Sequence, residues 1–155
     1  MQIVDPIFGE LSFDYGWHRN LKLNFYGKEF EIALIVSGDE DGIFGEGQYE
    51  AYKSLLQNWE QLQNNYLLAI LDYYVNTRCE LGYDDMENDE FPLVEEAVQI
   101  SEMISMTSIT VPFEEVLSGR DIGITFDCSW DNENGLGLRL INEEIYRIGY
   151  QDVAF

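Results

Sequence analysis

The stretch LKLNFYGKEFEIALIV, residues 21–36, holds two runs in which apolar and polar side chains alternate on either side of the pair Tyr26-Gly27. A period of two residues is typical of half-buried strands, and a glycine between two such runs marks a turn. The stretch therefore predicts a β-hairpin. Residues 8–15 alternate in the same way and end at Gly16, so we expect a three-stranded antiparallel meander in the first third of the chain.

After this meander, apolar side chains recur at steps of three and four residues from Tyr49 to Tyr74. This spacing is typical of an amphipathic helix, which we expect from Gln48 to about Arg78. The polar stretch QLQNN, residues 61–65, is where we expect a kink or break in that helix. We expect a shorter helix over residues 93–104, because Pro92 is suited to a first helical turn.

The last third of the chain contains four short segments with the pattern of strands, at residues 109–111, 122–130, 136–141 and 145–150. Strands, then helices, then strands is the order typical of α+β proteins. We therefore expect one domain over residues 1–155, with an α+β fold in which an antiparallel sheet of roughly six strands carries one long amphipathic helix and a short second helix. An arrangement as two small sheets stays open.

The charge of the chain restricts its function. Thirty acidic and eight basic residues give a net charge of −22 at pH 7. Such a surface repels phosphate, which nearly excludes a nucleic-acid binder and disfavours docking on anionic membranes. Aromatic residues make up 14% of the chain, and disordered acidic chains lack them. We therefore expect a packed core that includes Trp59 and Trp130.

The N-terminal residues MQIVDP have neither a basic region nor a long apolar run, and no apolar run elsewhere approaches about 18 residues. We therefore expect no signal peptide, no membrane span and a cytoplasmic location. The two cysteines, Cys79 and Cys128, stand far apart in sequence, and we expect ordinary thiols rather than a disulfide.

Two groups of acidic residues suggest a cation site, and each has a simpler interpretation as a turn. In the loop SGDEDGIFGEG, residues 37–47, Gly42 comes too early for the calcium loop of an EF-hand. Asp127, Asp131 and Glu133 surround a hairpin turn, where acids are common, and Asp152 would join them if the last strands pair. We expect no metal and no cofactor. A divalent-cation site or metal-dependent enzyme built on the second group is the alternative.

The middle of the chain lacks positive charge. Residues 79–119 contain eleven acids and no lysine or arginine. This run is either a solvated face or a surface that attracts an electropositive protein. With a single histidine, His18, and none of the glycine-rich or nucleophile motifs of common enzymes, we expect a non-enzymatic protein. The residues that we predict to bind a basic partner are Asp39, Glu40, Asp41, Asp84, Asp85, Glu87, Asp89 and Glu90.

Two C-terminal segments, FDCSWDNENGLGLR at residues 126–139 and IGYQD at residues 148–152, resemble an uncharacterised bacterial domain family. Its members carry a W-D-x-E-[HN]-G-[LVI]-[GA]-[LVI] segment and end near I-G-x-x-D. The resemblance implies an association with polymorphic toxins, whose immunity proteins are small, acidic and cytoplasmic. It supplies no active site, and Asn134 stands where relatives often have histidine.

We therefore expect a non-enzymatic acidic binding protein, an immunity protein that occludes a basic toxin surface. Besides the cation-dependent alternative, a structural or regulatory domain whose acidity serves only solubility is the third class that the sequence allows.

Overall fold

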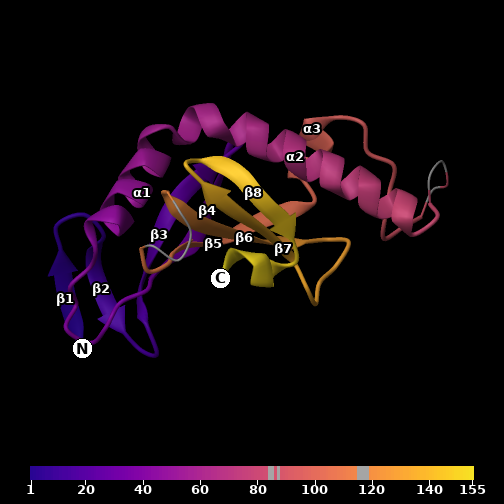
Figure 1. The fold of residues 1–155 in the computed structure, drawn as a ribbon. Coiled ribbons are helices and arrows are strands. Elements are labelled where there is room, and N and C mark those ends of the chain that lie inside the picture. Colours follow the sequence, from indigo (N-terminus) through magenta and orange to yellow (C-terminus); the bar gives the residue numbers. More distant parts are fainter. Residues whose placement is uncertain (84–85, 87, 115–118) are drawn as a thin grey trace.

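The structure, a computed structural model, describes residues 1–83, 86, 88–114 and 119–155. Within these residues eight strands form one sheet, in the spatial order of the sequence (Figure 1). The strands are β1 (Gln2–Asp5), β2 (Gly9–Phe13), β3 (Trp17–Phe25), β4 (Lys28–Val36), β5 (Ile104–Val111), β6 (Asp121–Cys128), β7 (Leu136–Ile141) and β8 (Glu144–Gly149). The helices are α1 (Glu46–Gln57), α2 (Trp59–Glu80) and α3 (Ala97–Ser101), and a 3-10 turn, η1 (Gln151–Ala154), follows β8.

The sheet is mixed. Every neighbouring pair of strands is antiparallel except β4 and β5, which run parallel with Leu34 opposite Ile109. A parallel pair needs a long crossover between its strands, and here the chain between β4 and β5 contains all three helices. The crossover lays α1 and α2 across one face of the sheet, as Figure 1 shows.

The prediction of an α+β fold with an antiparallel sheet of roughly six strands and one long helix is therefore wrong. The sheet has eight strands and one parallel pair among the described residues. The predicted long helix is divided at Asn58, whose φ of −105° and ψ of 6° are not helical. The break precedes the polar stretch at residues 61–65, because the side-chain amide of Asn58 donates to the carbonyl oxygen of Ser54 at 2.8 Å and so ends α1.

Two further elements differ from the sequence analysis. The predicted helix over residues 93–104 shortens to α3, and Ile104 begins β5 instead. A register shift between Met106 and Ser108 interrupts the alternation of β5, which explains why only its last residues had the pattern of a strand. The four-residue strand β1 pairs with β2 at the sheet edge and is too short for a periodic signal.

The hairpin at residues 21–36 is confirmed. Phe25 pairs with Lys28, and the two turn residues Tyr26 and Gly27 both have positive φ, 49° and 84°. Two positive φ values are what the type I′ turn of a two-residue hairpin requires. The turn also anchors α2, because the amide N–H of Tyr26 donates to the side-chain oxygen of Gln63 and the indole N–H of Trp59 donates to the carbonyl of Asn24.

One row of side chains shows where the core lies. Leu34, Ile109, Ile124 and Leu138 are consecutive partners across β4 to β7, and all four are 0% exposed. This row lies under the helical layer. Both predicted core tryptophans are confirmed, since Trp59 is 6% exposed and Trp130 is 8% exposed.

The opposite face of the sheet is covered at β5, β6 and β7 by the C-terminal turn η1. The hydroxyl of Thr110 donates to the carbonyl oxygen of Ala154 at 2.8 Å. A Cβ added at Gly123 would lie 2.0 Å from that same oxygen, so glycine is required for the close approach. No helix among the described residues is long and apolar enough to cross a bilayer.

Candidate functional site

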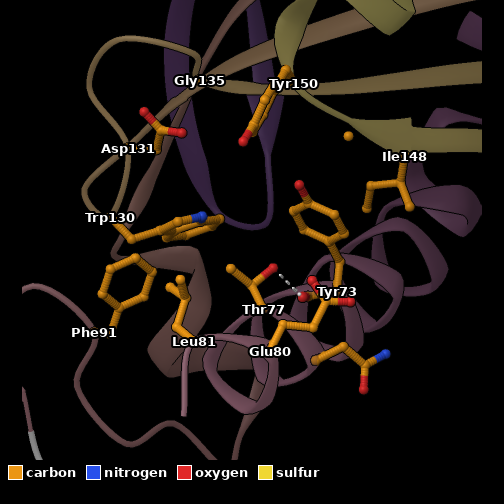
Figure 2. Close-up of a pocket in the computed structure, with 12 residues that line it drawn as sticks. Tyr73, Thr77, Glu80, Leu81, Phe91, Trp130, Asp131, Gly135, Ile148 and Tyr150 are labelled. Carbon is orange, nitrogen blue, oxygen red and sulfur yellow. Dashed lines mark hydrogen bonds between the residues drawn. The ribbon is translucent and has the colours of Figure 1, made fainter. Parts of the chain in front are cut away.

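A pocket of about 490 Å³ lies between the C-terminal half of α2 and the ends of the last strands (Figure 2). Helix α2 contributes Tyr73, Thr77 and Glu80, which follow one another at steps of four and three residues and so share one face of the helix. The turn after β6 contributes Trp130 and Asp131. The pocket is therefore built where the helical layer meets the turn after β6.

The end of β8 forms the other side of the pocket. Ile148 and Tyr150 line it there, and Tyr150 is 53% exposed at its rim. Figure 2 shows the rings of Tyr73, Trp130 and Tyr150 around one open space, with the two tyrosine hydroxyls directed into it. Three aromatic side chains from three separate elements thus converge.

The wall formed by Trp130 is fixed by the core behind it. The ring of Tyr74 packs edge to face against Trp130 with centroids 4.8 Å apart, and it stacks on Phe91 at 6.3 Å. Tyr74 is 0% exposed, and its hydroxyl donates to the carbonyl oxygen of Pro92 at 2.6 Å. Edge-to-face and offset pairs of this kind stabilise one arrangement of the rings. The wall is therefore preorganised.

Phe91 reaches the pocket because Arg78 holds the segment that follows α2. The guanidinium of Arg78, 4% exposed, donates from Nε to the carbonyl oxygen of Phe91 at 2.8 Å and also donates to the carbonyl of Met86. The cationic side chain is thus engaged by backbone oxygens of the acidic segment. This role was not visible in the sequence, where Arg78 only marked the approximate end of the expected helix.

Burial controls the protonation of two groups near the pocket. Burial raises the pKa of the Tyr73 hydroxyl, and the neighbouring Tyr150 adds to this effect. Burial also raises the pKa of the Cys128 thiol to about 11. Both groups are therefore neutral at pH 7. Tyr73 can donate a hydrogen bond, and Cys128 does not supply the thiolate that a nucleophilic cysteine needs.

The C-terminal acids of the alternative cation site do not form a ligand set. The carboxylate of Asp131 accepts two hydrogen bonds from Asn134, one from its backbone N–H at 3.1 Å and one from its side-chain amide at 3.0 Å. The carboxylate of Asp127 accepts from the side-chain amide of Gln151 at 3.3 Å. Glu133 and Asp152 are exposed. Within the described ranges, no three histidine, cysteine, aspartate or glutamate side chains gather as metal ligands would.

The acids predicted to bind a partner lie in two separate places. Asp39, Glu40 and Asp41 are exposed in the loop before α1, and Asp89 and Glu90 are exposed in the segment after α2. Helix α2 alone has 22 residues, a length of roughly 33 Å, so the structure does not bring the two groups together (Figure 1). The other three predicted acids, Asp84, Asp85 and Glu87, lie outside the described residues.

The loop before α1 is shaped by local bonds. The backbone carbonyl of Asp39 accepts the indole N–H of Trp17 at 2.8 Å, and the carboxylate of Asp41 accepts the backbone N–H of Ile43 at 3.0 Å. These contacts are turn chemistry of the kind that aspartate supports. The segment after α2 differs, because it adjoins the pocket through Phe91.

Sequence reasoning missed Tyr73, Thr77, Glu80 and Tyr150 as residues of a site. The steps of three and four residues between positions 73, 77 and 80 were a signal of a second face on α2. That face did not stand out beside the stronger apolar stripe of the same helix. No spacing or charge pattern pointed to Tyr150, although it lies in the C-terminal segment that carries the family resemblance. It reaches the pocket because β8 pairs with β7.

Both segments that carry the C-terminal sequence resemblance contribute to this pocket, Trp130 and Asp131 from the first and Ile148 and Tyr150 from the second. A family model described as a domain of unknown function, DUF6985, matches residues 7–155. The chain belongs to the DUF6985 family. The expected membership of an uncharacterised domain family is thereby confirmed, and the family match includes every pocket residue. Comparisons with curated proteins and with solved structures found no significant match.

Proposed function

We propose that this protein is a non-enzymatic binding protein whose partner is a basic protein, and that the partner docks on the end of the molecule that carries the pocket. The observation that carries the proposal is the composition of the pocket. Its lining contains the carboxylates of Glu80 and Asp131 and no lysine or arginine among the described residues. Asp89 and Glu90 are exposed directly before the lining residue Phe91.

The charge of the whole chain supports this direction. A net charge of −22 produces a long-range field that repels acidic partners and steers basic ones. The pocket offers aromatic surface for contact in addition to the attraction by charge. Aromatic anchors supply much of the binding energy of protein interfaces. Field and pocket together favour a basic protein over a small anionic ligand.

The chemistry near the pocket supports binding rather than catalysis. Tyr73 and Cys128 are kept neutral by burial, so neither is an activated nucleophile at pH 7. The single histidine of the chain, His18, lies in β3 opposite Ser12 and Ile35, far along the sheet from β7 and β8. Histidine, the commonest general base of enzymes, is therefore not available to the pocket.

In its finer form, the proposal is that the protein is an immunity protein and that its partner is a toxin. The acidic surface would cover the basic surface with which the toxin acts. If the toxin is a nuclease, carboxylates would occupy the positions of nucleic-acid phosphates. The sequence resemblance to domains associated with polymorphic toxins supports this form.

The test uses the candidate toxin, which is the product of the open reading frame next to the gene of this protein, purified as an inactive variant. Stopped-flow association should be fast at low ionic strength and should slow as salt rises, with the main change in the on-rate. A variant with Asp84→Asn, Asp85→Asn, Glu87→Gln, Asp89→Asn and Glu90→Gln should associate more slowly than wild type.

A matched control removes the same number of charges elsewhere. The control changes five exposed acids away from the pocket to their amides: Glu10, Asp14, Glu29, Glu31 and Glu50. It should slow association much less than the first variant. Equal effects of the two variants would show that only net charge matters, and a wild-type rate for the first variant would place the binding surface elsewhere.

A further inference from the structure

The described lining of the pocket combines aromatic side chains with two carboxylates and contains no lysine or arginine. We propose that it seats the guanidinium group of a single arginine from the partner, stacked among Trp130, Tyr73 and Tyr150 and paired with the carboxylates of Asp131 and Glu80. This inference rests on the proposed function, because it names the chemical group through which the basic partner anchors.

The arrangement of the rings is the first support. Figure 2 shows Trp130, Tyr73 and Tyr150 around a common space, from the turn after β6, from α2 and from the end of β8. The faces of aromatic rings attract cations, and tryptophan does so most strongly. Several rings around one space form the cage by which proteins recognise organic cations. Arginine fits better than lysine because its planar group stacks on rings and pairs with carboxylates.

The charges around the pocket are the second support. Glu80 is exposed at the end of α2, and Asp131 lies at the base of the turn beside Trp130. The nearest basic side chain on the same helix, Arg78, is buried and donates to the carbonyls of Met86 and Phe91. Its charge is therefore neutralised in part by backbone dipoles. The carboxylates of Glu80 and Asp131 line the pocket, and Asp131, which accepts two hydrogen bonds from Asn134, keeps lone pairs for a further donor.

Preorganisation is the third support. The indole of Trp130 is held against Tyr74, so its position is fixed before a ligand binds. The residue is 8% exposed, and a ligand would contact the part of it that lines the pocket. Tyr150, in contrast, exposes 53% of its surface to water at the rim. A cation that enters between the two rings would cover Tyr150 against a fixed wall. A volume of about 490 Å³ is sufficient for the side chain of an arginine with its flanking backbone.

The experiment uses the indole N–H signals of the intact protein in two-dimensional NMR. The probes are three blocked tripeptides, acetyl-Gly-X-Gly-amide, in which X is arginine, lysine or citrulline, the neutral shape analogue of arginine. The indole N–H groups of Trp17 and Trp59 donate to the carbonyls of Asp39 and Asn24, away from the pocket, and serve as internal references. Only the Trp130 signal should shift with the arginine peptide, and it should saturate.

The relative affinities of the three peptides test whether the pocket recognises a guanidinium group. The citrulline peptide should bind at least about five-fold more weakly than the arginine peptide. A five-fold change corresponds to the loss of about one cation–π contact. The lysine peptide should bind more weakly than the arginine peptide. Equal binding of arginine and citrulline, or stronger binding of lysine, would overturn the assignment of the pocket to a guanidinium group.

Matched variants place the binding in this pocket. Tyr150→Ala should weaken arginine binding at least about five-fold, and Tyr146→Ala, a change of a similarly exposed tyrosine outside the pocket, should not. Glu80→Gln should weaken binding, and Glu60→Gln at the other end of α2 should not. Unchanged Trp17 and Trp59 signals show that each variant is folded. Wild-type affinity in Tyr150→Ala would refute the inference.

The outcomes separate this inference from the proposed function. If the protein partner binds through the acidic segment but the tripeptides do not select arginine, the proposed function stands and the cage is wrong. If the pocket selects arginine but the variant with the five acidic changes at positions 84–90 associates with the protein partner at the wild-type rate, the cage stands and the docking surface of the proposed function is wrong.

Discussion

The ion pair between Asp121 in β6 and Arg139 in β7 offers a sharp test of what holds the sheet together. Nε of Arg139 donates to one carboxylate oxygen of Asp121 at 2.5 Å, and a terminal nitrogen donates to the other oxygen at 2.6 Å. The side chains are only 7% and 6% exposed. Replacing Asp121 by Asn keeps the shape of the side chain but leaves the guanidinium buried without its counter-charge.

The cost of this replacement follows from the burial of the pair. Charge centres about 4 Å apart attract by about 4 kcal/mol at an effective dielectric constant of about 20. Removal of one member of a buried pair costs about 3–5 kcal/mol in other proteins, since the remaining charge stays desolvated. We therefore expect Asp121→Asn to lower the free energy of unfolding by about 3–4 kcal/mol.

Urea unfolding measures this loss, provided that the slope against urea stays constant. The control is Glu143→Gln, which removes the same charge from the pair of Glu143 with Arg120. Because Arg120 is 39% exposed, this variant should lose at most about 1 kcal/mol. The double variant Asp121→Leu with Arg139→Met should regain most of the lost stability. A loss below about 1 kcal/mol for Asp121→Asn would refute the argument that this pair is buried and dry.

Three further predictions concern the stability of the chain. Because burial raises the pKa of Cys128 to about 11, the unfolded chain loses this thiol proton first; stability should fall as pH rises from about 9 to 11. When urea unfolding is measured across that pH range, the free energy of unfolding should fall less for Cys128→Ala than for wild type. Melting temperature at pH 7 should rise with added NaCl, because salt screens the repulsion among charges that sum to −22, and a flat curve would contradict this. Trp130→Ala should cost about 3 kcal/mol in calorimetric or urea unfolding, since the indole packs against Tyr74; unchanged stability would mean that the ring does not support the core.

Local patterns in the sequence were sufficient for several elements. The alternation on either side of Tyr26-Gly27 determined the β3–β4 hairpin, because the side-chain period and the turn are both set within a few residues. The three- and four-residue spacing of apolar side chains determined that the chain between the sheet halves is helical. The polar stretch at residues 61–65 indicated a break in this helix but not its position, because α1 ends at Asn58 through local bonds to the carbonyl oxygen of Ser54.

The tertiary structure alone decided the parallel pairing of β4 with β5 and the pocket. A strand buried on one face has the same pattern whether its neighbour is parallel or antiparallel, so Leu34 and Ile109 gave no sign of facing each other. Tyr73, Trp130 and Tyr150 come from three elements whose closeness depends on how α2 crosses the sheet. The sequence by itself determined the acidity, the core tryptophans and the local elements, since these depend on composition and short-range periodicity. The pocket required long-range packing, which no local pattern encodes.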